Sequence, residues 1–553
     1  MALPNWLATI AAGMPAVPDL EALMWPAAII VALTISAGIA VWFTRDRYAP
    51  IRAMRARFIY GVPWGSVLVL GLVVLVYLFV QDGRTSLTQP VFLPYVNWSY
   101  LYPTGVILAP LSHGSLGHFI SNISVALVLA PIAEYIYGHY PPDDPWRLER
   151  PLWDRPVVRA VVIFPGVAMV VAIVSSLFAW GPVIGFSGVV FALAGFTAIK
   201  YPLITLIAIL ARSALSQLGN ALFNPVVEAS VRETVSQPGW VGVSFQGHAL
   251  GFLLGVVLAI ALLHRRPHDS PASPLRLWFG LSVLALTMSL WAIWFSQGSE
   301  RYVLYQGLGV ALVFVGVALI LIAALTSGRS IWGGLTRRHV AIVGILVPLV
   351  LLSLVAIPMN VLEVSEYDRP DNAVSVGDYD VFYTDGVENR LRPAIGLMDD
   401  SPGTSRGVIV VSESRHLWTT AKSSSNLERS GSTTIRLGGI GWAASVHVDR
   451  EGWSPVGNDT VYRVNVSDGD TVSTTFLADE RMAQPTVEGH RIAIGTQGEH
   501  FTVIVTDPTG EQVTAPIPDE NESVELGELT IERDDDELVA RAEDTTVGVA
   551  SQE

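Results

Sequence analysis

The sequence contains no cysteine, and among its 553 residues lysine occurs only at positions 200 and 422. The lack of cysteine excludes disulfide bonds, thiolate metal sites and a cysteine nucleophile. Charged residues make up only 15%, against about 25% in an average soluble domain. Because hydrophobic residues reach 51% and the mean hydropathy is +0.46, the composition excludes a wholly soluble protein and indicates a membrane protein.

Charge divides the chain into two unequal parts. Residues 1–359 carry 20 basic and 13 acidic side chains, whereas residues 360–553 carry 14 basic and 36 acidic ones. The acidic part would repel phosphate groups, so nucleic acid is not expected as a partner. An acidic, lysine-poor surface is typical of high-salt habitats, where screening weakens repulsion between carboxylates, and it predicts a halophilic source.

Ten apolar runs lie before residue 358, each near the length of about 20 residues that crosses a lipid bilayer. They are predicted at 26–44, 61–80, 118–138, 157–180, 187–203, 204–222, 248–264, 275–295, 302–326 and 339–357. Arginine gathers in alternate loops, beginning with 45–60, and such loops are typical of the cytoplasmic side. Ten crossings then place the N-terminus and residues 358–553 outside the cell, in a multi-pass protein of the cell membrane.

Polar groups at the outer ends of three predicted helices need an explanation, because burying them in lipid is costly. The first motif contains His113, His118 and Asn122, and the last two lie four apart on one helical face. By itself this motif is also typical of histidines at the membrane interface and of an asparagine that joins two helices by hydrogen bonds.

The second motif is Gly185-Phe-Ser-Gly188, in which Ser187 opens a helix after a short external loop. A serine at a tight helix start, beside free backbone N–H groups, can serve as a nucleophile next to an oxyanion site. Small residues at this spacing also allow ordinary tight helix packing in lipid.

The third motif begins at His248 and continues through Gly251 and Gly255. Glycines four apart form a smooth helix face, which would pack closely against the small residues of the second motif. We expect this contact to bring His248 beside Ser187, with the ring of Phe191 one turn deeper stacked on the imidazole.

Together these residues resemble the rhomboid family of intramembrane serine proteases. The family pattern is His-x4-His-x3-Asn on the second core helix, Gly-x-Ser-Gly at the start of the fourth, and His-x2-Gly-x3-Gly on the sixth. The matching residues are His113, His118, Asn122, Gly185, Ser187, Gly188, His248, Gly251 and Gly255. The resemblance covers about residues 60–266. One departure is Trp98-Ser99 in the external loop 81–117, where family members often carry a Trp-Arg pair.

The resemblance implies a catalytic dyad with Ser187 as the nucleophile and His248 as the general base. It implies an oxyanion site made of Asn122, His118 and the backbone N–H of Ser187. It implies neither a cofactor nor a metal, and its substrates would be single-pass transmembrane proteins cut near the outer membrane face.

We therefore expect a polytopic α-helical membrane protein with a six-helix core, about four extra helices and a β-rich domain. The expected parts are an N-terminal helix with a basic loop (1–59), the catalytic core (60–266), three additional helices (267–357) and an acidic extracellular domain (358–553). Short alternating stretches separated by turn residues predict a β-sandwich for the last part, and we expect it to fold by itself.

Three other functions stay open. His113, His118 and His248 could supply ligands for a hydrolytic metal, although the sequence has no HExxH motif. A catalytically inactive adaptor could bind transmembrane helices, but such proteins typically lose the serine or the histidine. A transporter would need charged residues deep in the bundle, and few interrupt the apolar runs.

Overall fold

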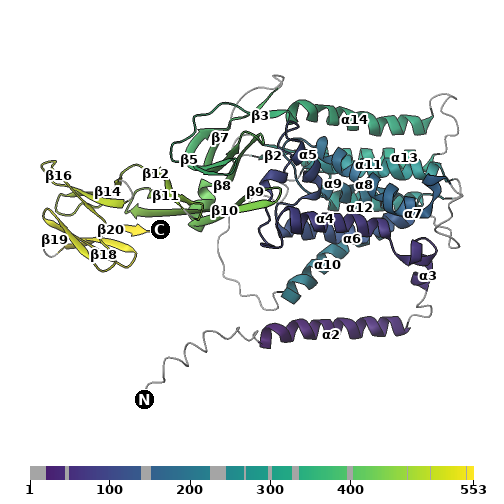
Figure 1. Cartoon of the computed structure of the whole chain (residues 1–553), viewed down its shortest axis with the longest axis horizontal. Helices are drawn as coiled ribbons and strands as arrows, with labels where there is room; N and C mark the ends of the chain where they lie inside the picture. The colour runs from purple at the N-terminus through teal and green to yellow at the C-terminus, as the bar shows by residue number, and fades with distance from the viewer. Residues whose placement is uncertain are drawn as a thin grey trace, which may run out of the picture.

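The computed structural model of the chain consists of a helical bundle and an elongated β region at one end of it (Figure 1). It describes the chain apart from residues 1–19, 44–48, 139–150, 224–243, 267–268, 297–301, 327–335, 395–402, 470, 498–499 and 543–544.

The apolar runs form the helices of the bundle. The longer elements are α2 (Leu20–Phe43), α4 (Trp64–Leu75), α6 (Leu116–Tyr137), α8 (Phe164–Leu177), α9 (Ser187–Lys200), α10 (Pro202–Phe223), α11 (Phe245–His264), α12 (Pro274–Thr287), α13 (Gln306–Leu325) and α14 (Arg337–Asn360). Shorter turns are α3 (Ala49–Arg55), η1 (Ile59–Gly61), η2 (Val76–Val80), η3 (Leu93–Tyr95), α5 (Pro103–Leu108), η4 (Ala109–Leu111), η5 (Leu152–Asp154), α7 (Pro156–Val158) and η6 (Arg159–Ile163).

Six helices of the described chain are long and apolar enough to cross a membrane, and four shorter apolar helices accompany them. These ten coincide with the ten predicted runs, and the chain is a multi-pass membrane protein. One boundary differs from the prediction over 275–295. The helix α12 ends at Thr287, because Ser289 has a φ of 56° that no right-handed helix accommodates. The strands β1 (Trp294–Ser296) and β2 (Tyr302–Leu304) then pair as an antiparallel ribbon before α13.

The C-terminal region is built of antiparallel strands, which confirms its predicted β-rich character. In chain order they are β3 (Leu362–Val364), β4 (Val374–Val376), β5 (Tyr379–Glu388), β6 (Leu391–Pro393), β7 (Thr404–Ser412), β8 (Leu417–Ser423), β9 (Ser432–Gly439), β10 (Trp442–Pro455), β11 (Val461–Ser467), β12 (Val472–Leu477), β13 (Arg481–Met482), β14 (Arg491–Gln497), β15 (His500–Thr506), β16 (Gln512–Pro516), β17 (Ser523–Leu526), β18 (Leu529–Asp534), β19 (Glu537–Ala542) and β20 (Thr545–Gln552). A short helix, α15 (Ser424–Ser430), joins β8 to β9.

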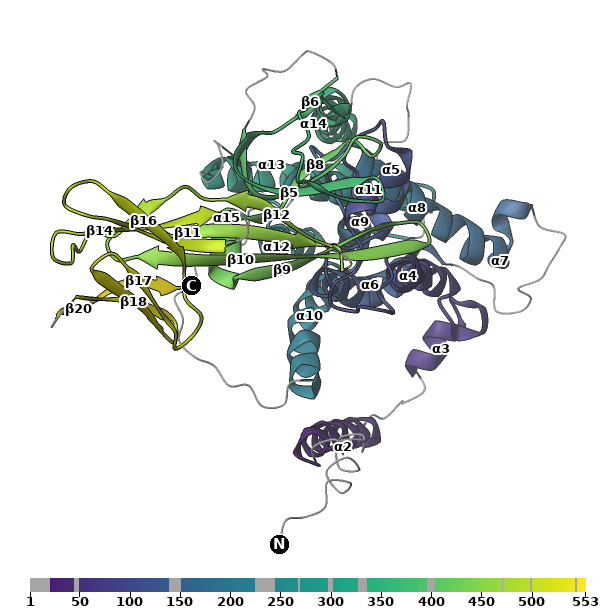
Figure 2. The same ribbon diagram turned by 60° about the vertical axis from the view of Figure 1, so that its left-hand side comes forward.

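The β region contains two large hydrophobic cores and a smaller cluster around Phe382, Ile409 and Trp418, where the sequence predicts one sandwich. The proximal core lies between the sheet β4-β5-β7-β8 and the strands β9 to β12. The distal core lies between the sheet β13-β14-β15-β16 and the strands β17 to β20. The long strand β10 joins the two, because Val446 and Val448 belong to the proximal core and Trp453 to the distal one (Figure 2).

The proximal core also contains residues from the loop between α4 and α6. Leu93, Val96 and Trp98 are at most 8% exposed and pack among its valines and leucines. The indole of Trp98 donates to the carbonyl of Leu93 at 2.7 Å, and the Ser99 hydroxyl accepts from the backbone N–H of Leu362 at 3.1 Å. The loop that departs from the family pattern is thus bound beneath the β region.

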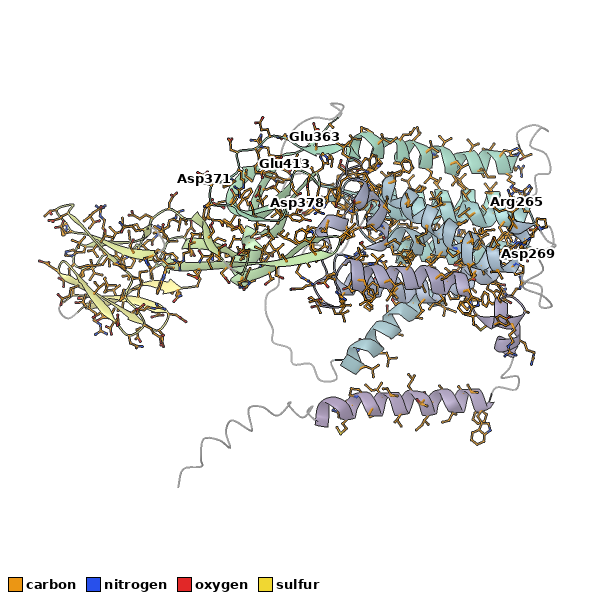
Figure 3. The ribbon with its side chains drawn as sticks, viewed as in Figure 1. Arg265, Asp269, Glu363, Asp371, Asp378 and Glu413 are labelled. Carbon is orange, nitrogen blue, oxygen red and sulfur yellow. The ribbon has the colours of Figure 1, made fainter. Side chains whose placement is uncertain are left out.

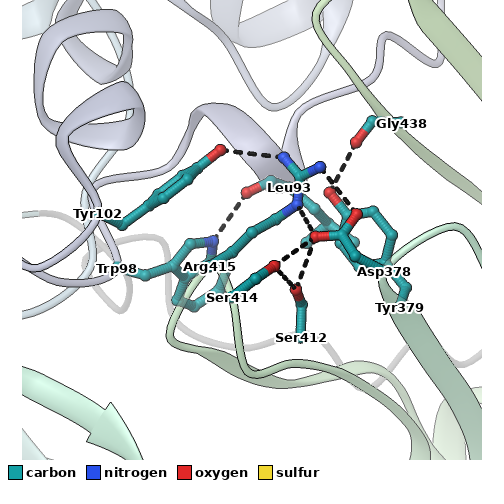
Figure 4. A network of polar contacts seen from close by, with 9 residues as sticks. All are labelled: Leu93, Trp98, Tyr102, Asp378, Tyr379, Ser412, Ser414, Arg415 and Gly438. Carbon is teal, nitrogen blue, oxygen red and sulfur yellow. Dashed lines mark hydrogen bonds and ion pairs between the residues drawn. The ribbon is translucent and has the colours of Figure 1, made fainter.

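Polar contacts strengthen this junction. Arg415 lies between the Asp378 carboxylate, at 2.6 Å, and the Tyr102 hydroxyl, to which it donates at 3.0 Å (Figure 4). Arg436 forms a second ion pair with Asp82 at 2.7 Å, at the start of the same loop. The β region is therefore joined to the bundle by both apolar and charged contacts, and its folding by itself stays a prediction.

Candidate active site

Ser187 is the first residue of α9. Ile184, three residues before it, packs against the proximal core of the β region, so this end of α9 faces the β region. The turn before it is held from two sides: the N–H of Gly185 donates to Ala109 at 2.9 Å, and that of Gly181 donates to the side chain of Asn360 at 2.8 Å. As the first helical residue, Ser187 has a backbone N–H without a partner inside its own helix. Its hydroxyl and this N–H lie at a fixed, half-buried position.

Gly185 is required at its position for two reasons. Its φ of +123° lies in a region that side chains rarely adopt. A Cβ placed there would also approach Nε2 of His118 to 2.7 Å and Nδ2 of Asn122 to 3.6 Å. The turn before Ser187 therefore lies directly against the two side chains that the sequence motif on α6 singles out.

Close packing of α9 and α11 sets the position of His248. A Cβ at Gly251 would lie 2.3 Å from the carbonyl oxygen of Gly188, and one at Gly255 would lie 1.9 Å from that of Ala192. Only hydrogen atoms fit at these positions, so the two backbones are in direct contact. The glycine spacing predicts this contact.

The helix contact brings the two expected catalytic groups together. Nε2 of His248 lies 2.9 Å from Oγ of Ser187, within hydrogen-bonding distance. The ring of Phe191 stacks on the imidazole with centroids 4.1 Å apart and an angle of 13° between the planes. Within the described residues no hydrogen bond or ion pair links His248 to a carboxylate, as expected for a pair rather than a triad of groups.

His118 and Asn122 lie in the first two turns of α6, whose N-terminus is capped by the Ser115 hydroxyl. Asn122 is only 6% exposed, and its Nδ2 has no hydrogen-bond partner among the described residues. A buried amide without a partner is rare and costly in a folded protein. Its donor faces the turn of Gly185 and Ser187, where it could bind an oxygen that carries negative charge.

His113 lies before α6 and is fully buried. Its ring contacts those of His118 and Phe119, at centroid distances of 5.1 and 5.3 Å. Gln81, which sequence reasoning missed, binds both backbone groups of His113, each at 2.8 Å. In the sequence, the only indication of this role is that Gln81 is a polar residue directly after the apolar run 61–80. Among the described residues, no three histidines or carboxylates form a group that could hold a metal ion.

Glu134 connects α6, the helix of His118 and Asn122, to the first turn of α4. Its carboxylate accepts from the backbone N–H groups of Gly65 and Ser66 at 3.1 and 2.8 Å, and from the Ser66 hydroxyl at 2.7 Å. A carboxylate bound to the first N–H groups of a helix satisfies donors that otherwise lack partners. This contact attaches α4 to α6 at the end of the bundle remote from Ser187.

The chain was compared with protein-family models, with curated proteins and with solved structures. The family model described as Rhomboid domain matches residues 101–265, which span α5 to α11 and include all three motifs. No curated protein and no solved structure matches the chain.

Proposed function

We propose that this protein, whose residues 101–265 form a rhomboid domain, is an intramembrane serine endopeptidase with Ser187 and His248 as its catalytic dyad. The observation that carries the proposal is the distance of 2.9 Å between the serine hydroxyl and the imidazole. Both groups are half-buried near the end of the bundle, so water can reach them while the helices exclude bulk solvent. The rhomboid family acts on transmembrane proteins in the lipid bilayer, and this chain is a multi-pass membrane protein.

In the proposed first step, the Ser187 oxygen attacks the carbonyl carbon of the peptide bond while its proton moves to Nε2 of His248. The imidazolium then gives this proton to the departing amine nitrogen, which leaves an ester on Ser187. In the second step, His248 takes a proton from water, the hydroxide attacks the ester, and the serine regains its proton. Phe191 stacks on the imidazole and limits its rotation during both proton transfers.

The negative oxygen of each tetrahedral intermediate would be bound by Asn122, His118 and the backbone N–H of Ser187. The support is the buried, unpartnered Nδ2 of Asn122 and its place beside the turn of Gly185. Donors that are already oriented toward developing charge lower the barrier without reorganisation during the reaction. Gly251 and Gly255 serve this site by holding α11 against α9, and Gly188 serves it by letting α9 lie against Ser175 of α8.

The proposed substrates are single-pass transmembrane proteins that are cut near the outer membrane face. The support is the position of the dyad in the first turns of α9 and α11, at the end of the bundle opposite to the arginine-rich loops. An orientation with residues 358–553 outside the cell follows from those loops.

The acidic surface of residues 358–553 further favours a high-salt habitat. A melting temperature of this region that is the same in molar and in millimolar salt would contradict the high-salt habitat.

An inactive adaptor that binds transmembrane helices is the alternative, and labelling separates it from an enzyme. A fluorophosphonate should label the full chain at Ser187, and Ser187→Ala and His248→Ala should each abolish cleavage of a transmembrane substrate. The double variant should be no worse than either single one, because nucleophile and base act as a unit. Ser282→Ala, at a buried serine of α12, is the matched control and should cleave normally. Full activity in Ser187→Ala would overturn the proposal.

A further inference from the structure

A cavity of about 720 Å³ lies between helices of the bundle and extends from Val189 on α9 to the arginines that follow α11. Its walls come from the end of α6, from η5, η6 and α8, and from the facing residues of α9 and α11, among them Val189 and Ala192 in the first half of α9. Most of the lining is apolar, including Val171, Leu193 and Phe196. The cavity is separate from the dyad, although α9 and α11 contribute to both.

The cavity opens on the lipid-facing surface of the bundle. Val167 on α8 and Leu258 on α11 belong to its rim, and they are 43% and 37% exposed. An apolar hollow on this surface is not filled by water, because its walls offer water too few polar partners. A hydrocarbon chain from the bilayer would restore the dispersion contacts that an empty hollow lacks.

Three arginines line the inner end of the cavity: Arg159, Arg265 and Arg266. In the part of the chain that the structure describes, Asp154 is the only acidic residue that lines the cavity. Arg265 is exposed near the last turn of α11, at the opposite end of the bundle from the acidic groups of the β region (Figure 3). A hollow that is apolar along its walls and positive at one end matches a molecule with a hydrocarbon tail and an anionic head.

The positive charge at this end is only partly neutralised. Arg159 and Arg266 donate to the last carbonyl groups of α6, but Nε of Arg159 is buried without a partner among the described residues. Asp269 lies 4.0 Å from Arg266 but forms its shorter contact, 2.6 Å, with Lys200. Burial, and after it the positive charge of the neighbouring Arg159, lower the pKa of Arg266.

We propose that this cavity binds an anionic phospholipid, with the phosphate at Arg159, Arg265 and Arg266 and one acyl chain along the wall between α8 and α11. Basic pockets between helices at the cytoplasmic side are suited to phosphate head groups. The volume of the cavity is sufficient for a ligand, since ligand sites usually enclose about 300–1,000 Å³. The proposal is independent of catalysis, because none of the three arginines lies near the dyad.

Native mass spectrometry of the detergent-purified full chain tests this site. Phosphatidylglycerol should remain bound in preference to phosphatidylcholine of the same acyl composition. Arg265→Gln should weaken phosphatidylglycerol binding about fivefold, since one arginine contributes about 1 kcal/mol near a phosphate surface. The matched control is Arg276→Gln, an exposed arginine at the start of α12 that does not line the cavity, and it should bind as the unchanged protein does.

A second variant tests the acyl-chain wall. Ala261 is exposed and lines the cavity one turn before Arg265, so Ala261→Trp fills the hollow without removing charge. It should reduce phosphatidylglycerol retention while Ser187 still reacts with fluorophosphonate, which shows an intact bundle. Equal retention of both lipids, or equal binding in the Arg265→Gln and Arg276→Gln variants, would overturn the proposal. Displacement of the lipid by millimolar inorganic phosphate alone would show a phosphate site and not a lipid site.

Discussion

In the helical bundle the closest contacts join backbone to backbone, whereas at the base of the β region they join charged side chains. Carbonyl oxygens of α9 lie where Cβ atoms of Gly251 and Gly255 would be. The β region instead contacts the loop between α4 and α6 through side chains, such as Arg415 with the Tyr102 hydroxyl and Arg436 with the Asp82 carboxylate. The two regions also differ in formal charge, which is positive before residue 360 and strongly negative after it.

The difference follows from the solvent of each region. In lipid no hydrophobic driving force separates helices from acyl chains, so close backbone packing must hold the bundle together. In water the β region buries valines and leucines in two small cores and leaves its charges at the surface. The loop between α4 and α6 belongs to both regions, because it carries Trp98 in the proximal core and His113 beside the candidate site.

The largest expected effect concerns this shared loop. Trp98→Ala in the full chain should destabilise the proximal core by about 3–5 kcal/mol, because it removes a large buried side chain. Hydrogen exchange should accelerate in β10 near Val446 and remain slow in the distal strand β18. Trp153→Ala, at a side chain that is 72% exposed, is the control and should change little. If Trp98→Ala leaves β10 protected, the β region is independent after all.

The second prediction concerns Asn122, the proposed donor to the oxyanion in the bundle. Asn122→Ala should lower kcat by roughly 10- to 1,000-fold with a smaller effect on KM, because its contact strengthens in the transition state. His118→Ala should also lose activity, whereas His113→Ala should lose less. Labelling of Ser187 by fluorophosphonate reports whether each variant is folded. An unchanged kcat in Asn122→Ala would remove this residue from the mechanism.

Two glycines of the bundle provide a matched pair. Gly255→Ala should destabilise the bundle by about 1–3 kcal/mol, because the added methyl group meets the carbonyl of Ala192. Gly71→Ala adds the same group to α4, where nothing lies within 4 Å, and should be neutral or slightly stabilising. Thermal unfolding of both variants in one detergent provides the comparison. Equal melting temperatures would show that backbone contact does not hold α9 to α11.

The smallest expected effect lies at the junction of the regions and depends on pH. Burial raises the pKa of Asp378, but hydrogen bonds from Arg415 and Ser414 outweigh it and lower the pKa to about 2. Since the folded pKa lies below the ordinary 3.8, the stabilisation is complete above about pH 4 and is lost as the pH falls toward 2. Asp378→Asn should therefore cost about 1 kcal/mol at pH 7, a value reduced for solvent screening.

Denaturant titrations of the full chain at pH 7 and at pH 3 check this dependence. The difference between Asp378→Asn and the unchanged protein should shrink at the lower pH. Asp519→Asn removes an equal charge from an exposed turn and serves as the control, with no pH-dependent difference expected. A difference that grows on acidification would show that the ion pair of Arg415 does not stabilise the junction.

Local patterns in the sequence were sufficient for the helices and for the candidate site residues. Helix spans follow from apolar length, since a lipid environment permits few alternatives to a helix. The contact between α9 and α11 follows from glycines four apart, because this spacing presents one smooth face. The end of α12 could not be predicted, since the left-handed backbone of Ser289 lies in a run that is apolar on both sides.

The sequence by itself thus determined the membrane bundle, the β-rich character of the C-terminal region and the residues that meet at Ser187. Only the tertiary structure decided that Trp98 lies in the β region and that Tyr102 meets Arg415, more than 300 positions away. It also decided that Arg159 and Arg265 line one cavity. The spacing of apolar residues along a segment predicts which of its faces is buried. It does not predict which distant segment covers that face, because this contact depends on the shape and charge of both surfaces.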